Sequence, residues 1–148
     1  MFDAPPWPPS DPTTALACTI WMEARGDGLE GMSAVANVVL NRACHPRWWG
    51  EDVVSVCLAP YQFSSWNEGS TEIPLVQVAL SGRDPTYSTA YNIAHAVLSG
   101  ILLDNTENAD SYYDPDEIDP PPTWAIPSQF TKKIGRQKFY RTELPPLV

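Results

Sequence analysis

Histidine and cysteine, which often bind metals or take part in nucleophilic catalysis, are scarce in this chain. Its 148 residues include two histidines and three cysteines. No Cys-x-x-Cys or His-x-x-x-His spacing is present, so we expect no metal site and no cofactor. A Ser-His-Asp arrangement is improbable with so few histidines, and the Gly-x-Ser-x-Gly, phosphate-loop and dinucleotide motifs are missing.

Long apolar segments are also missing. The longest apolar runs, such as residues 101–103, are far too short to cross a bilayer. Residues 1–9 lack the basic and apolar regions of a secretory signal. We therefore expect synthesis in the cytoplasm without a signal peptide, and no membrane partner. Cys18, Cys44 and Cys57 cannot all pair, which fits a reducing compartment; Cys18 and Cys57 are predicted as small core residues.

Basic residues are half as frequent as acidic ones. The chain has 9 Lys and Arg against 18 Asp and Glu, for a net charge of −9. This charge argues against binding to nucleic acid, and against electrostatic adhesion to anionic membranes or wall polymers. We expect a monomer. The basic residues near the C-terminus are interpreted as a solvated face rather than a binding patch; they are Lys132, Lys133, Arg136, Lys138 and Arg141.

The remaining pattern predicts a mainly α chain with a small β-element, in the α+β class. Residues 1–10 are interpreted as a proline-rich arm, and residues 11–148 as one domain. Asp11-Pro12 is typical of a helix start, and Gly26 of its end. Further helices are expected over residues 29–43, 51–58, 74–80 and 85–98, the first of them central. Tyr112-Tyr113 is strand-like, and residues 134–141 alternate like an edge strand.

Glu23 is the strongest candidate for chemistry. It is predicted on the last turn of the first helix, where the negative end of the helix dipole disfavours a carboxylate. Partial burial would add to this effect, and both would raise its pKa and retain a proton near neutral pH. A carboxylic acid in that state can donate a proton to the leaving oxygen of a glycoside.

Two other segments leave alternatives open. Residues 61–67 mix aromatic and amide side chains, which suits either a sugar-binding surface or a loop held in place by its aromatics. Seven acidic residues between positions 104 and 119 suggest a calcium loop, but the EF-hand pattern is absent and a solvated loop is favoured. His95 is interpreted as a packed or surface residue.

Residues 21–42 resemble the opening motif of the SleB-type cell wall hydrolases, a family that includes spore-cortex-lytic enzymes and phage lysins. The motif consists of a Glu-Ala-Arg-Gly segment and a Val-Ala-Asn-Val-Val-Leu-Asn-Arg helix. The resemblance continues at residues 62–67, 109–113, 124–125 and 134–140, in the expected order. It departs at Asp27, which replaces a glutamate, and at Ser111 and Gln137, where relatives often have histidine.

The resemblance implies a lysozyme-like fold and cleavage of the β-1,4 bond between N-acetylmuramic acid and N-acetylglucosamine in peptidoglycan. By this resemblance the catalytic acid is Glu23. We expect a lytic transglycosylase mechanism, since it needs one carboxylate. The predicted partner is the glycan strand, and the candidate substrate-binding residues are Gln62, Ser64, Trp66, Tyr112 and Tyr113.

Three alternatives remain at this point. A hydrolytic muramidase would need a second group to handle water, for which Asp27 and Glu30 are nearby candidates. A non-catalytic glycan-binding or virion structural module would explain the departures at Ser111 and Gln137. An amidase or peptidase is disfavoured because such an enzyme would normally require metal ligands or a Cys-His pair. A phage endolysin, released by a holin or carried on the virion, fits the pattern, and a bacterial origin stays open.

Overall fold

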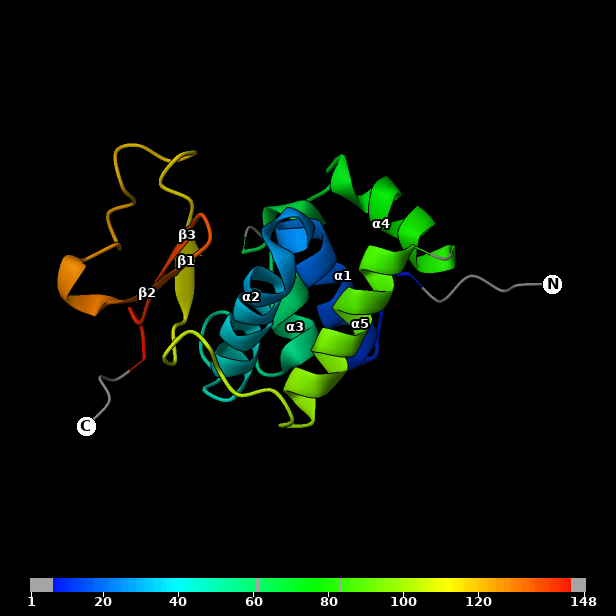
Figure 1. Cartoon of the computed structure of the whole chain (residues 1–148), viewed down its shortest axis with the longest axis horizontal. Coiled ribbons are helices and arrows are strands. Elements are labelled where there is room, and N and C mark those ends of the chain that lie inside the picture. The colour runs from blue at the N-terminus through cyan, green and yellow to red at the C-terminus, as the bar shows by residue number, and fades with distance from the viewer. Residues whose placement is uncertain (1–6, 61, 83, 145–148) are drawn as a thin grey trace.

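The computed structural model describes residues 7–60, 62–82 and 84–144. The α-helices pack into one body, and a small sheet stands beside α2 (Figure 1). The helices are α1 (Pro12–Ala24), α2 (Gly28–Ala43), α3 (Val53–Leu58), α4 (Glu72–Ser81) and α5 (Pro85–Leu98). Three 3-10 turns are η1 (Arg25–Asp27), η2 (Ser64–Trp66) and η3 (Pro127–Gln129), and the strands are β1 (Ser111–Tyr113), β2 (Phe130–Ile134) and β3 (Gln137–Tyr140). The predicted mainly α chain with a small β-element is confirmed.

Helix α1 lies at the centre of the helical body. It contacts α2, α3, α4 and α5, and every residue from Ala15 to Met22 is buried. A helix that is apolar on all sides is typical of such a position. The small side chains of Ala15, Ala17 and Cys18 let the neighbouring helices approach. Helix α2 is buried as predicted, but α1 holds the centre that the sequence pattern assigned to α2.

Aspartate caps fix where the predicted helices begin. Asp11 accepts a hydrogen bond from the Thr14 amide at the start of α1, and Asp84 does the same for Tyr87 at the start of α5. In both helices a proline follows the cap, as the sequence predicted. Asp52 caps α3 through the Ser55 amide, so α3 begins at Val53 rather than at the predicted Glu51.

The glycine predicted to end α1 was the wrong one. Gly26 lies inside the 3-10 turn η1, and the left-handed backbone conformation belongs to Gly28, with φ of 74°. The chain therefore tightens into one 3-10 turn after Ala24 before it reverses. Glu23 still lies in the last turn of α1, as predicted.

The prediction of an edge strand over residues 134–141 was also wrong. Gly135, with φ of 57°, turns the chain between β2 and β3, and the strand order is β1-β3-β2 with antiparallel pairing. β3 is therefore the central strand. Its alternation reflects two covered faces: Phe139 packs against Ala34 and Val38 of α2, whereas Tyr140 stacks on Tyr113.

Residues 1–6 of the predicted N-terminal arm lie outside the described residues. Within residues 7–10, Pro9 is buried, and Trp7 stacks on Trp66 with ring centroids 5.4 Å apart. The end of this segment therefore contacts the helical body.

Cys18 and Cys57 are buried, as predicted, while Cys44 is exposed, and all three thiols are free. Burial raises the pKa of Cys18 and of Cys57 to about 12. Within the described ranges no helix is long and apolar enough to span a bilayer.

The acidic segment of residues 104–119 is only in part the solvated loop that was predicted, because it contains β1 and some of its carboxylates are buried. The Asp104 carboxylate accepts hydrogen bonds from the backbone of Thr106 and Asn108 and from the Asn41 side chain. Asp110 is fully buried. Glu107 and residues 116–119 are exposed.

Asp110 fastens the last described residues of the chain to the sheet. Its carboxylate accepts hydrogen bonds from the backbone amides of Thr142, Glu143 and Leu144, at 2.9 to 3.0 Å, and from the Thr142 hydroxyl. Burial opposes ionisation, but these hydrogen bonds outweigh it and hold the pKa of the Asp110 carboxyl below its usual range.

We predict that Asp110→Asn lowers the free energy of unfolding by about 2–3 kcal/mol, because buried amides lose a charged acceptor. A carboxyl whose pKa is depressed by folding stabilises the fold above its unfolded pKa, near 4. That contribution is lost as the pH falls through the lower, folded-state pKa. In urea unfolding, the difference in the free energy of unfolding between the wild type and this variant should therefore decrease below about pH 4. Asp116→Asn, at an exposed position, is the control; an equal loss in both variants would contradict the assignment.

Candidate active site

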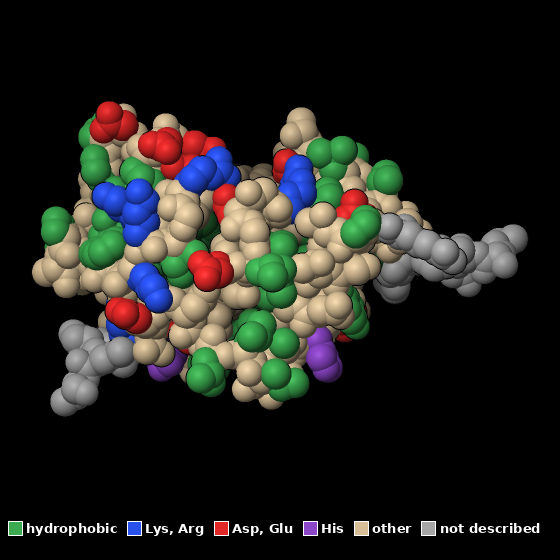
Figure 2. Space-filling model, viewed as in Figure 1, with side chains coloured by type: hydrophobic (Ala, Val, Ile, Leu, Met, Phe, Trp, Pro, Cys, Tyr) green, Lys and Arg blue, Asp and Glu red, His purple; other side chains and the backbone are tan. Residues whose placement is uncertain are grey.

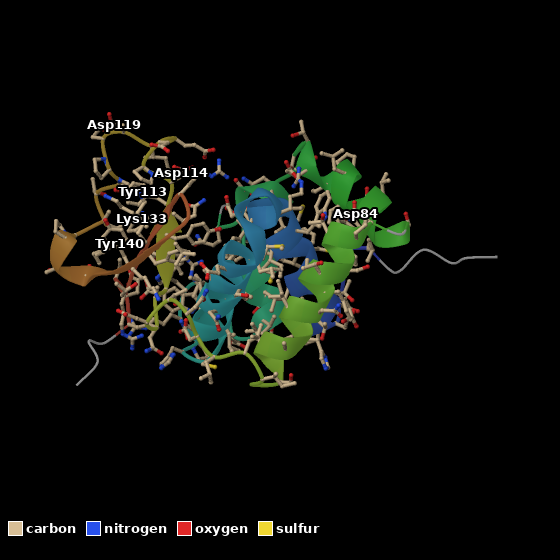
Figure 3. All side chains as sticks on the ribbon, viewed as in Figure 1. Asp84, Tyr113, Asp114, Asp119, Lys133 and Tyr140 are labelled. Atoms are coloured by element: carbon tan, nitrogen blue, oxygen red, sulfur yellow. The ribbon has the colours of Figure 1, made fainter. Side chains whose placement is uncertain are left out.

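A groove of about 810 Å³ runs between the helical body and the sheet. In Figure 2 the upper outline of the molecule dips between the sheet part and the helical part. One wall comes from the end of α1, from Arg42 of α2 and from residues 62–65; the other comes from β1, the loop that follows it, and the start of β3. Figure 3 shows Tyr113, Asp114, Lys133 and Tyr140 on the sheet side of the molecule and Asp84 on the helical side.

Glu23 lies in the groove and is held from two directions. Its Oε1 accepts a hydrogen bond of 2.9 Å from the Tyr112 hydroxyl, on β1. Its Oε2 accepts one from the Ser65 hydroxyl, in η2 of the helical wall. Ser65 is buried and Glu23 is half-buried. Two neutral hydroxyls from opposite walls therefore orient one carboxyl group, while part of it stays open to the groove.

Tyr112 is suited to act as a permanent donor. Its desolvation in the groove and the adjacent Glu23 carboxylate raise the pKa of the Tyr112 hydroxyl well above its usual range. Its ring packs against Phe139, with centroids 5.4 Å apart, so the side chain is fixed by the sheet. The hydroxyl therefore keeps its proton and points it at Glu23.

The other carboxylates near Glu23 have different environments. Glu72 also lines the groove, but it forms an ion pair with Arg25, whose Nη2 lies 3.1 Å from Glu72 Oε1. Asp27 accepts from Arg136 Nη2 at 2.7 Å and does not line the groove. Glu30 is exposed and lies outside the groove. Neither of the two residues predicted as a possible second carboxylate therefore reaches the groove.

Arg42 is a groove residue that the sequence analysis missed. It is 8% exposed, and its Nε donates to the Asp110 carbonyl oxygen at 2.7 Å. Burial lowers the pKa of its guanidinium, and no carboxylate of the described residues forms an ion pair with it. A charged residue at the buried end of an apolar helix was the available signal.

The structure places four of the five predicted substrate-binding residues along the groove; they are Gln62, Ser64, Tyr112 and Tyr113. Trp66 is not among the lining residues. Its indole Nε1 donates to Thr19 Oγ1 at 2.9 Å and its ring stacks on Trp7, so its contacts are those of a packing residue.

Two tryptophans that the sequence analysis did not select line the groove instead. Trp48 is 63% exposed and Trp124 is 36% exposed. Exposed aromatic rings in a groove offer flat apolar surfaces to a ligand. Both described histidines, His45 and His95, are exposed and lie outside the groove. Among the described residues, no group of three or more His, Cys, Asp or Glu is arranged to hold a metal ion.

Comparison with known proteins identifies a family and relatives for this chain. A family model described as cell wall hydrolase matches residues 26–140, so Glu23 lies three residues before the match begins. The spore cortex-lytic enzyme of Bacillus subtilis (strain 168) is 30% identical over 125 residues, which cover 84% of this chain and 35% of that protein. The chain therefore spans about a third of the length of this curated relative.

Two solved structures share the fold. The catalytic domain of the germination-specific lytic transglycosylase SleB from Bacillus anthracis matches with a TM-score of 0.65 and 26% identity, over 91% of this chain and 98% of that one. The catalytic domain of the Bacillus cereus SleB protein matches with a TM-score of 0.64 and 28% identity, over 93% and 95%. These matches confirm the predicted lysozyme-like arrangement.

We predict that Glu23→Gln lowers the pKa of Tyr112, because the variant removes the negative charge that opposes ionisation of the phenol. The pKa should stay above its usual value, since burial remains. NMR titration of 13C-labelled tyrosine would show this as one resonance shifting at lower pH. An unchanged Tyr112 titration would contradict the Glu23–Tyr112 contact; Glu30→Gln is the control and should leave all tyrosine resonances unchanged.

Proposed function

The chain belongs to the cell wall hydrolase family, and we therefore propose that it cleaves peptidoglycan glycan strands as a lytic transglycosylase. The bond would be the β-1,4 linkage between N-acetylmuramic acid and N-acetylglucosamine. A lytic transglycosylase is what the matching Bacillus anthracis structure is called. One observation carries the proposal: Glu23 is oriented in the groove by two neutral hydroxyls, with no cation of the described residues in an ion pair with it.

Glu23 can serve both halves of such a reaction. Protonated Glu23 would donate its proton to the glycosidic oxygen as the bond from that oxygen to C1 of the muramic sugar breaks. The carboxylate left behind would then take the proton of the muramic 6-hydroxyl as the O6 oxygen bonds to C1. A 1,6-anhydro ring forms, Glu23 regains its proton, and no water is consumed.

The contacts of Glu23 support this exchange of roles. Tyr112 and Ser65 donate to its two oxygens when it is ionised, which stabilises the carboxylate produced by the first step. Hydroxyl groups can also accept a hydrogen bond from the protonated form. The same two side chains can therefore hold the group in one place throughout the cycle.

A hydrolytic muramidase is the alternative that uses the same groove. It would need a group to activate water, and Asp27 is instead held by Arg136 outside the groove. Among the other carboxylates that line the groove, Asp114 is the buried one, and its Oδ2 lies 4.0 Å from Arg136 Nη1. Asp114 would therefore be the candidate for that role. Product analysis separates the two reactions.

The proposed glycan-binding residues are Gln62, Ser64, Tyr112 and Tyr113, which line the groove. Trp66 was predicted to share this role; its packing on Trp7 and Thr19 supports a structural one instead. The biological setting that we propose is wall degradation by a phage endolysin, which a host-range lysis assay would test.

We predict that Glu23→Gln abolishes lysis, with a loss of activity of at least about a hundredfold, because the amide has no proton to donate. A zymogram on purified peptidoglycan measures this, and circular dichroism should show an unchanged fold. Glu30→Gln replaces an exposed carboxylate outside the groove and should stay active. A lytic Glu23→Gln variant would exclude Glu23 as the acid, and an inactive wild type would favour a non-catalytic glycan-binding module.

We predict that digested peptidoglycan carries 1,6-anhydromuramic ends. Mass spectrometry of the products distinguishes them, since the anhydro ends are one water lighter than the reducing ends that hydrolysis leaves. Reduction with borohydride provides the check, because only reducing muramic ends gain hydrogen. Predominantly reducible ends would show that the protein is a muramidase.

A further inference from the structure

Four buried side-chain atoms in the described part of the chain have no hydrogen-bond partner, and two of them belong to residues that line the groove. These are the Arg42 Nη1 donor and the Gln137 Oε1 acceptor. Arg42 is 8% exposed and Gln137 is 9% exposed. A buried polar atom without a partner is destabilising, so natural proteins keep few of them. A ligand that forms hydrogen bonds with these two atoms would explain why they have no partner within the protein.

Their positions relative to Glu23 follow from the register of the sheet. Tyr112 pairs with Phe139 across β1 and β3, and residues directly opposite each other share a face. Gln137 is two residues before Phe139, so it projects from the same face as Tyr112, toward the helical body. Continuing the register places Gln137 opposite Asp114, just after the end of β1.

Arg42 lies at the other end of β1, since its Nε donates to the carbonyl oxygen of Asp110. From Asp110 to Asp114 an extended chain covers about 13 Å. Tyr112, which binds Glu23, is midway between them. The unpartnered donor and the unpartnered acceptor therefore flank the Glu23–Tyr112 contact on opposite sides.

The charges of the groove indicate what these two groups would bind. Glu23, Glu72, Asp114, Glu117 and Glu143 all line it. Arg25 and Arg136 partly neutralise Glu72 and Asp114, and the remaining carboxylates disfavour an anionic group at the positions of Arg42 and Gln137. A neutral ligand with both a carbonyl oxygen for Arg42 and an N–H for Gln137 fits better. The acetamido group of an N-acetyl sugar carries both, and successive N-acetyl sugars would present it on each side of the bond that Glu23 faces.

We propose that Arg42 and Gln137 recognise the acetamido groups of the glycan on the two sides of the Glu23–Tyr112 contact. Arg42 Nη1 donates to an acetamido carbonyl oxygen, and Gln137 Oε1 accepts from an acetamido N–H. This inference rests on the proposed function, because it assigns substrate-binding residues to the same groove. It makes the N-acetyl group, rather than the sugar ring alone, the feature that selects the substrate.

The test compares two neutral β-1,4-linked sugars, chitotetraose with acetamido groups and cellotetraose without them. Calorimetry is done in the Glu23→Gln background, so that no sugar is cleaved. This parent should bind chitotetraose more tightly. Adding Gln137→Leu or Arg42→Lys should weaken chitotetraose binding about tenfold, the effect of one hydrogen bond, and leave cellotetraose binding unchanged. Gln77→Leu and Arg47→Lys, at exposed positions outside the groove, should bind like the parent.

Thermal unfolding separates binding from a structural role. Gln137→Leu removes an acceptor that has no partner, so its melting temperature should be unchanged or higher. A lower melting temperature would assign Gln137 to stability and overturn its part of the proposal. The proposal is also overturned if the parent binds chitotetraose and cellotetraose with equal affinity. It is likewise overturned if both variants bind chitotetraose as tightly as the parent does, or if their affinity falls equally for the two sugars. Peptidoglycan cleavage by the wild type is measured separately, so the proposed function can stand when this inference fails.

Discussion

The hydrogen bond between Tyr112 and Glu23 joins the two halves of the molecule at the point where chemistry is proposed. Glu23 belongs to the helical body and Tyr112 to the sheet, and 89 positions separate them in the chain. The two halves meet where Phe139 and Ile134 pack on Ala34 and Val38 of α2, and residues of both halves line the groove. Ser65 approaches the same carboxyl from the helical side. One carboxyl group is thus oriented by side chains that only the complete fold brings together.

The rest of the structure keeps that contact in place. Burial of α1 on all sides fixes the helix that carries Glu23. On the other side, Phe139 packs on Ala34 and Val38 of α2 and holds the sheet against the helical body. The Asp27–Arg136 ion pair adds a second link, between the turn after α1 and the turn between β2 and β3. Displacement of either half would separate Tyr112 from Glu23.

Much of the helical body could be predicted from sequence because its signals are local. Asp-Pro pairs mark the starts of α1 and α5, and apolar spacing marks α2. The position of Glu23 at the end of α1 followed from the same signals. The sheet was harder. Its central strand β3 pairs with β2, from which a two-residue turn separates it, and also with β1, which lies more than 20 residues earlier in the chain. The turn glycine was misassigned since Gly26 and Gly28 are equally plausible until the 3-10 turn is seen.

The candidate site, too, could be predicted only in part from the sequence. Four of the predicted binding residues do line one groove; they are Gln62, Ser64, Tyr112 and Tyr113. The second donor to Glu23, Ser65, was missed because the sequence does not distinguish it from Ser64, and only the direction of its side chain in η2 does. Arg42 was read as part of a helix motif, and only its burial and its unpartnered nitrogen reveal it as a groove residue.

The most direct test of the account is a crystal structure of the Glu23→Gln variant with a bound muramic acid-containing tetrasaccharide. The account predicts that the glycosidic oxygen lies within about 3.2 Å of the side chain at position 23, with the glycan running between the helical wall and β1. A glycan bound elsewhere, or a glycosidic oxygen that faces Asp114 instead, would contradict it.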